Sequence, residues 1–391
     1  LITSIIYKEI SANNSFSFKN FYQRRIRRII PPLFFVMLAS FPFAYFFLLP
    51  SDFIDFSKSI LFSIGFVSNY FFYLSEMEYG ANSSLLLPFL HTWSLSIEEQ
   101  FYIFFPLVFF LIYKFLKKYH FIFFCLLLLS SLFLTIIFSY ENSLKNFYLI
   151  QTRAWEILFG SLLALMSFKY QNKISPIKSD IFCISGLLLI FYSLFFFNES
   201  TSHPSYISLI PVIGVCLIIW FTRSDNFFKK FLSNKIFVFI GLISYSLYLW
   251  HFPVFSFVRI IEFTQSSILK KIFVVILVFL LSILSYYLIE QPSRNRKNSF
   301  KKILYLILIC FALNIGLNSI TIHNKGFANR IPDFLVNMIN QTNTPWNKLI
   351  NEQSGKTCYG ALEPCIFNSQ GENKIFLIGD SHATTIAYDL K

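Results

Sequence analysis

The sequence places a candidate nucleophile close to its last residue. Lys374–Ile378 is a short apolar run that predicts a β-strand, and it leads directly into Gly379-Asp380-Ser381-His382. A strand ending in Gly-Asp-Ser is typical of the nucleophile turn of a serine esterase or transacylase, in which the Ser381 hydroxyl attacks an acyl group and its backbone N–H binds the oxyanion. The required base is not expected from the adjacent His382 and should lie further along. The alternative is an ordinary helix cap.

Four arginines lie within five residues in the stretch from Phe21 to Pro32. In most membrane proteins such a cluster is a topology anchor at the inner end of a span. Two features favour a binding role as well: the planar fork of arginine grips phosphate bidentately, and the two prolines that close the stretch would start the next span at a fixed angle. A cytosolic phosphorylated donor such as an acyl-coenzyme A would fit here.

A second polar stretch runs from His91 to Tyr102 and contains two adjacent carboxylates at the start of an apolar helix. Carboxylates are costly in lipid, although acidic residues also favour helix N-termini, so a capping role is the alternative. Together with His91 and Trp93, Glu98 suggests a polar pocket that faces an outer cavity. Acids and aromatic rings suit polyhydroxyl ligands, so we expect this pocket to bind sugar.

Three further positions combine charge or imidazole with an apolar run. Arg153 and Glu156 are three residues apart and share one helix face, which favours an ion pair that locks two helices over direct chemistry. His251 lies deep in a predicted span, where a functional role and a hydrogen-bonded packing role weigh equally. Glu290 is a candidate catalytic carboxylate; since it ends a span before a basic loop, a structural pair with Arg294 is the alternative.

The composition is that of a bilayer protein. Hydrophobic residues make up 55% of the chain and charged residues 14%, whereas soluble domains carry about a quarter charged residues. A span needs ~20 mostly apolar residues, and lipid favours helices because it offers no partner for unpaired backbone groups. Nine runs qualify: Leu33–Leu49, Ile97–Phe115, Phe121–Phe138, Phe147–Phe168, Ile181–Phe197, Tyr206–Phe221, Ile236–Ile260, Ile272–Ile289 and Ile303–Ile320.

Basic loops decide the topology. If the apolar run Phe56–Leu74 does not span, every basic loop falls on the inner side, and few lysines remain outside. We therefore interpret Phe56–Leu74 as a re-entrant or interfacial segment on the outer side. The net charge of +13 is then a consequence of topology, and binding to nucleic acid is not expected. Since the region after Ile320 falls outside, a disulfide between Cys358 and Cys365 is expected there.

The sequence predicts an all-α polytopic membrane helix bundle followed by the start of an extracytoplasmic α/β domain. Residues 1–320 form the membrane region, 321–373 a polar linker rich in Asn, Thr, Pro and Gly, and 374–391 the strand and turn that open the next domain. Because the chain begins at Leu1 rather than Met and stops soon after Ser381, we expect it to be a piece cut at both ends.

Taken together, these stretches resemble the acyltransferase-3 family of integral-membrane O-acyltransferases, in its form fused to an SGNH domain. The similarity covers nearly the whole chain. It rests on five motifs: the arginine cluster, the stretch from Trp93 to Tyr102, the stretch that begins at Arg153, the stretch Ser244–His251 and Glu290-Gln-Pro. The matching residues are Arg24, Arg25 and Arg28; Trp93, Ser94, Leu95, Glu98, Phe101 and Tyr102; and Arg153, Trp155, Glu156 and Gly160.

The resemblance implies an O-acyltransferase of the bacterial inner membrane. Arg24, Arg25 and Arg28 would hold the phosphates of cytosolic acetyl-CoA, with no bound cofactor and no metal, and Ser381 would pass the acetyl group to a cell-envelope glycan. Lipopolysaccharide O-antigen is the first expectation for this acceptor and peptidoglycan the second. The family has eleven spans, so two would precede Leu1, including the one with its catalytic histidine, and we expect this piece alone to be inactive. A transporter or flippase is the competing class.

Overall fold

A computed structural model describes residues 1–13, 15–77, 84–170, 174–198, 201, 203–222, 226–262 and 267–332. The chain divides into two compact units, Leu1–Gly326 and Phe327–Lys391, and the structure discussed below belongs to the first. Within the described ranges the chain forms helices and no β-strand. The predicted nucleophile Ser381 and the predicted disulfide of Cys358 and Cys365 lie outside the described residues.

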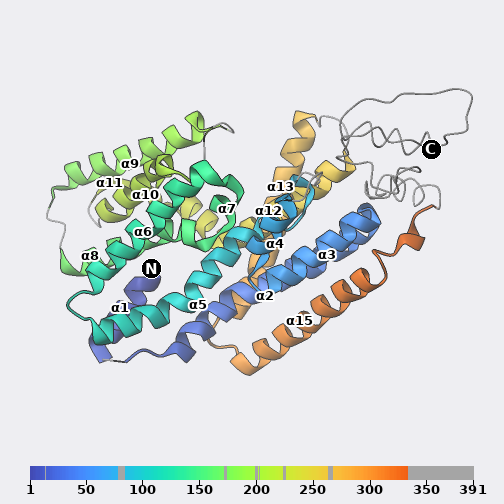
Figure 1. The fold of residues 1–391 in the computed structure, drawn as a ribbon, viewed down its shortest axis with the longest axis horizontal. Helices are drawn as coiled ribbons and strands as arrows, with labels where there is room; N and C mark the ends of the chain where they lie inside the picture. Colours follow the sequence, from blue (N-terminus) through green and yellow to red (C-terminus); the bar gives the residue numbers. More distant parts are fainter. Residues whose placement is uncertain are drawn as a thin grey trace, which may run out of the picture. The chain divides into compact units, whose positions relative to one another are not determined.

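The first unit is a bundle of long helices joined by short helical turns (Figure 1). The helices in chain order are α1 (Ile2–Asn13), α2 (Phe18–Phe47), α3 (Pro50–Ile64), α4 (Ser68–Met77), α5 (Thr92–Phe115), α6 (His120–Glu141), α7 (Ser143–Tyr148), α8 (Ile150–Lys169), α9 (Pro176–Phe196), α10 (Leu209–Phe221), α11 (Phe227–Leu232), α12 (Lys235–Ile261), α13 (Ile268–Ser285), α14 (Gln291–Arg294) and α15 (Phe300–His323). A π-helical turn, η3 (Tyr286–Glu290), links α13 to α14.

Eight helices in the described part of the chain are long and apolar enough to cross a membrane, as expected of a multi-pass membrane protein. They correspond to eight of the nine predicted spans. The ninth, Tyr206–Phe221, is apolar but shorter. Its α-helical part, α10, has 13 residues and is therefore about 20 Å long, less than the ~30 Å hydrocarbon core. All nine predicted apolar runs are therefore helical in the described residues, and eight of them have the length of a span.

Helix α2 begins much earlier than the sequence analysis expected. The predicted span starts at Leu33, after a basic loop, whereas α2 is continuous from Phe18, where the Ser17 side chain caps it, through Pro31 and Pro32. Pro31 and Pro32 leave the carbonyls of Arg27 and Arg28 without their usual backbone donors. A neighbouring helix contacts the residue that follows, because the Tyr245 hydroxyl of α12 donates to the Ile29 carbonyl at 2.9 Å. The arginine cluster therefore lies on a rigid helix.

The segment predicted to be re-entrant or interfacial is broken into α3 and α4. The break is at Gly65, which caps α3, and at Phe66, which has a φ of 53°. Neither helix has the length of a span. The Gln100 side chain donates to the Phe66 carbonyl at 2.8 Å, so the break is tied to α5 in its first turns. Helix α3 also packs on α15, and α4 on α5.

Helices α9 and α10 approach each other closely at two glycines. A Cβ atom added to Gly186 would lie 2.6 Å from the Gly214 carbonyl oxygen, and one added to Gly214 would lie 2.6 Å from that of Gly186. Small residues allow this kind of backbone approach between membrane helices. The short helix α10 is thus held by direct backbone proximity to α9.

Replacing Gly186 or Gly214 by valine should lower the thermal stability of the protein in detergent, because each new side chain must push the helices apart. Overpacking of this kind costs about 1–3 kcal/mol. Gly241→Val in α12 is the matched control, since nothing lies within 4 Å of a Cβ at that position. Size-exclusion chromatography after heating measures the effect; equal melting temperatures for all three variants would contradict the close approach.

Candidate active site

A cavity of about 640 Å³ lies between α1, α2, α5, α8, α10 and α12. The ionisable side chains of its lining come from three of these helices: Arg25 and Arg28 from α2, Glu98, Glu99 and Tyr102 from α5, and Tyr245 and Tyr248 from α12. Hydroxyls such as those of Ser161 in α8 and Ser244 in α12 line the cavity as well. The sequence analysis expected Glu98 in an outward-facing pocket with His91. The structure instead places Glu98 in one cavity with the two arginines.

The arginines of α2 face different directions. The Arg25 guanidinium lies 4.9 Å from the ring centroid of Tyr102 and 5.7 Å from that of Phe21. Arg28 lines the cavity with it, one turn further on. Arg24 is exposed and is absent from the cavity lining. Of the three arginines predicted to bind a donor, two therefore share the cavity.

Arg27, which the three-arginine motif leaves out, has a structural role. Its side chain is buried and donates to three backbone carbonyls of α14 and the segment that follows it, those of Ser293, Asn295 and Asn298, at 3.3, 3.1 and 2.9 Å. The Arg27 guanidinium also lies over the Phe300 ring, 5.4 Å from its centroid. Because these contacts fix the rotation of α2 about its axis, they direct Arg25 and Arg28 toward the cavity.

The carboxylates of the cavity differ in their partners. Glu98 accepts a hydrogen bond from the Tyr102 hydroxyl at 3.4 Å. Glu99 is 7% exposed, and its Oε1 atom has no hydrogen-bond partner among the described residues. Glu99 was not among the predicted site residues, although two adjacent carboxylates in an apolar helix indicate a polar environment for both. A buried acceptor without a partner is costly, so Glu99 is poised to accept a hydrogen bond from a ligand.

Helix α12 extends from this cavity to a pair of histidines. The His91 and His251 ring centroids are 5.3 Å apart, although the sequence analysis treated the two residues as separate motifs. The Tyr248 hydroxyl donates to the His91 carbonyl at 2.6 Å and contacts the Ser94 hydroxyl at 3.0 Å. These contacts fix α12 against the first turn of α5 and so bring the histidines together.

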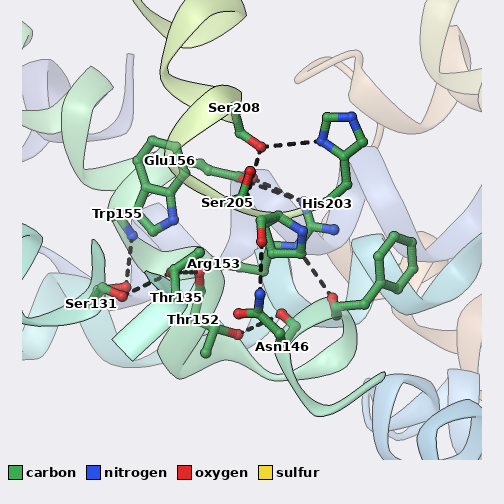
Figure 2. Close-up of polar contacts among 12 residues, drawn as sticks. Ser131, Thr135, Asn146, Thr152, Arg153, Trp155, Glu156, His203, Ser205 and Ser208 are labelled. Atoms are coloured by element: carbon green, nitrogen blue, oxygen red, sulfur yellow. Dashed lines mark hydrogen bonds and ion pairs between the residues drawn. The ribbon is translucent and has the colours of Figure 1, made fainter. Parts of the chain in front are cut away.

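Arg153 forms a locking cluster, as the sequence analysis favoured. Figure 2 shows its ion pair with Glu156, at 3.1 Å, within a network of backbone and side-chain hydrogen bonds. The Arg153 Nε also donates to the Phe147 carbonyl at 3.2 Å, and its guanidinium lies 5.1 Å from the Trp93 ring. Asn146 donates to the Pro204 carbonyl at 2.7 Å in the same network. The cluster joins α5, α7, α8 and the turn before α10.

Glu290 forms the ion pair with Arg294 that the sequence offered as the alternative to a catalytic role. Its side chain is 1% exposed and pairs with Arg294 at 3.0 Å. Its second oxygen accepts a hydrogen bond from the Ser246 hydroxyl at 2.9 Å. Glu290 lines neither the arginine cavity nor the smaller cavity beside His251. Its contacts connect η3 to α12 and α14, and neither cavity gives the predicted catalytic role of Glu290 a position that faces a substrate.

The comparisons with known proteins agree with this architecture. A protein family described as an acyltransferase domain matches residues 5–290, which include both arginines of the cavity, the carboxylates and both histidines. The chain belongs to this acyltransferase family. The transporter alternative is thereby set aside, and the membrane helices described above are those of an acyltransferase domain.

Two relatives of the chain illustrate the similarity. A protein of Staphylococcus aureus strain COL, provisionally named an O-acetyltransferase, is 32% identical over 307 residues that cover 75% of this chain and 50% of the relative. The O-acetyltransferase OatA of Staphylococcus aureus strain NCTC 8325 / PS 47 is 31% identical over 319 residues, covering 78% and 52%. The chain thus spans about half the length of the curated relatives it matches. No solved structure matches the acyltransferase chain.

Replacing Arg27 by methionine should destabilise the acyltransferase domain. The change leaves three carbonyls without their charged donor, and a hydrogen bond to a charged group contributes about 1.5–3 kcal/mol. We expect a lower melting temperature and a smaller yield of monodisperse protein. Arg24→Met is the matched control because Arg24 is exposed on the same helix. A melting temperature for Arg27→Met equal to that of Arg24→Met would contradict the structural role of Arg27.

Proposed function

We propose that the intact protein transfers an acetyl group from cytosolic acetyl-CoA to a hydroxyl of a cell-envelope glycan. Membership of the acyltransferase family and relatives named O-acetyltransferase support the reaction class. The donor assignment rests on one cavity. Arg25 and Arg28 of α2 line it together with Glu99, whose Oε1 atom has no hydrogen-bond partner among the described residues. The predicted topology places this cavity toward the inner, cytosolic side.

The two guanidiniums suit the phosphate groups of a coenzyme A donor. Arginine can bind phosphate through two parallel N–H···O bonds, and it stays charged at any physiological pH. Arg25 and Arg28 are one turn apart, so both can reach a single pyrophosphate. Arg24 lies one turn before Arg28 and is exposed to solvent, so its charge would attract the anionic donor.

The carboxylates beyond the arginines would orient the donor. Phosphates are repelled by Glu98 and Glu99, so they would remain at the arginine end. The uncharged arm of the coenzyme would then pass the carboxylates, and the unpaired Glu99 oxygen would accept a hydrogen bond from one of its N–H or O–H groups. The cavity thereby distinguishes the two ends of the donor by charge.

The acceptor side follows from the predicted topology and the predicted SGNH turn. In this proposal the region after Ile320 lies outside the bacterial inner membrane, and Ser381 of the SGNH domain receives the acetyl group and delivers it to sugar. Lipopolysaccharide O-antigen and peptidoglycan are the candidate acceptors. Mass analysis of both glycans from a deletion strain would identify the acceptor by the loss of acetyl esters from one of them.

The donor assignment is tested with Arg25→Ala and Arg28→Ala in the full-length protein. Since each change removes charge-assisted hydrogen bonds that contribute about 1.5–3 kcal/mol, the Kd for acetyl-CoA should rise ~10- to 100-fold. Glycan O-acetylation should fall in parallel while membrane insertion is unchanged. Arg296→Ala, an equal loss of charge at an exposed inner-side position, should leave the Kd within about twofold. Unchanged donor affinity in both cavity variants would refute the assignment.

A further inference from the structure

The cavity that contains Arg25 and Arg28 has one part without ionisable side chains. Its ionisable side chains come from α2, α5 and α12, whereas the side chains that α1, α8 and α10 contribute carry no charge. Those of α1 and α8 include the hydroxyls of Thr3, Ser4 and Ser167. A substrate group that is polar but uncharged would therefore suit this part of the lining.

Helix α8 contributes the smallest of these residues. Gly160, Ser161, Ala164 and Ser167 line the cavity at helical spacing and form what we call the α8 wall. A Cβ atom added to Gly160 would have no described atom within 4 Å, unlike the glycines at which α9 and α10 meet. Gly160 therefore widens the cavity instead of letting two backbones approach.

A buried carboxylate indicates that a ligand occupies the same cavity. Glu99 is 7% exposed, and its Oε1 atom has no hydrogen-bond partner among the described residues. Because an isolated buried acceptor is costly, this oxygen indicates a ligand that donates to it. Glu99 and the α8 wall line one cavity, so the wall borders a binding site.

Helices α5 and α8 run side by side in the same direction. Near their first residues, the Arg153 guanidinium of α8 lies 5.1 Å from the Trp93 ring of α5. Near their last residues, both contact Tyr7 of α1, whose ring centroid is 5.8 Å from that of Tyr113 and 4.8 Å from that of Phe168. Positions on the two helices can therefore be compared by counting residues from the first contact.

The α8 wall begins at the level of the arginines. Gly160 is seven residues beyond Arg153, about 10 Å along α8, and Tyr102 is nine residues beyond Trp93, about 14 Å along α5. These levels differ by less than one helical turn. Since the Arg25 guanidinium lies over the Tyr102 ring, Gly160 and Arg25 are at similar depths in the cavity.

The rest of the wall continues away from the carboxylates. Ala164 and Ser167 are about 6 and 10 Å beyond Gly160 along α8, whereas both carboxylates precede Tyr102 on α5. The lining therefore changes along the bundle from carboxylates to arginines and then to the small, uncharged residues of α8.

We propose that the part of the cavity bordered by the α8 wall binds the purine nucleoside of the donor. This inference rests on the proposed function, because it requires the pyrophosphate of acetyl-CoA at Arg25 and Arg28 and its arm beside the carboxylates. The nucleoside is attached to the other end of the pyrophosphate, so it extends from the arginines toward Ala164 and Ser167. Its ribose phosphate stays at the arginine end.

The chemistry of this lining matches a nucleoside. The Ser167 hydroxyl donates to the Ala164 carbonyl at 2.7 Å, which leaves its oxygen to accept from a ribose hydroxyl or from the purine amine. The small side chains of the α8 wall leave room for a flat ring, and Trp220 of α10 adds an aromatic ring to the cavity lining. Bases bind to aromatic side chains by stacking, which requires no charged group.

The test compares two donors on the full-length protein in detergent. One is acetyl-CoA, and the other is acetyl-phosphopantetheine, which has the arm and a phosphate but no nucleoside. Ala164→Leu fills the space beyond the arginines with little change in helix propensity. The Kd for acetyl-CoA should rise ~5- to 100-fold, as on loss of a stacked base, while that for acetyl-phosphopantetheine stays within about twofold. Ala312→Leu, at an exposed position of α15, is the matched control and should change neither Kd.

A second variant and a third ligand make the result independent of one substitution. Ser167→Leu should show the same pattern, and adenosine bisphosphate, the nucleoside half of the donor, should compete with acetyl-CoA less well in both variants than in the wild-type protein. An equal loss of both donors, or an unchanged Kd for acetyl-CoA in both variants, would overturn the nucleoside site. Failure of the wild-type protein to bind acetyl-CoA would instead refute the proposed function, so the two failures are distinguishable.

Discussion

The cost of placing charge inside a lipid-embedded bundle is the constraint on which this structure depends. Ionisable groups within membrane helices must pair with one another or face a polar cavity. Arg153 with Glu156 and Arg294 with Glu290 satisfy this by ion pairing. The arginines and carboxylates around the large cavity satisfy it by facing shared space. The same requirement that keeps the bundle stable therefore also gathers these charged groups around one cavity.

Helix α2 carries both an anchoring arginine and the arginines that line the cavity. Arg27 donates to backbone carbonyls on one side of the helix, while Arg25 and Arg28 line the cavity on another. Because residues 25 and 28 are three apart and residue 27 is not on their face, one helix can anchor itself and present a binding surface at the same time. The Tyr245 hydroxyl of α12 also donates to the Ile29 carbonyl on this helix and so contributes to its fixed position.

The α5–α12 interface links the charged cavity to the middle of the bundle. Broken helices α3 and α4 brace the start of α5 through Gln100 and through the Ser68 and Ser96 hydroxyls, which are 2.8 Å apart. The Tyr248 hydroxyl then fastens α12 to the same turn of α5. A rigid interface of this kind holds reactive groups at fixed separations, which is how binding energy at one end of a substrate contributes to chemistry at the other.

Much of the fold followed from local patterns in the sequence. Length and hydropathy predicted nine apolar helices, eight of which have the length of a span. Helical spacing predicted the pairing of Arg153 with Glu156. Both predictions depend only on residues close together in the chain. The start of α2 was placed too late, since two prolines that are typical of a helix start lie inside it. The predicted bounds of the run Tyr206–Phe221 match a helical segment, but its first turn is a 3-10 helix and its α-helical part has only 13 residues.

The amino-acid sequence by itself determined which helices form and which polar residues they carry into the membrane. Only the tertiary structure decided that Glu98 shares a cavity with Arg25 and that His91 lies against His251. Hydropathy and periodicity are local properties, whereas the rotation of each helix about its axis is set by contacts with distant segments, such as those of Arg27 beyond α14. The composition of the site is therefore a property of the packed bundle.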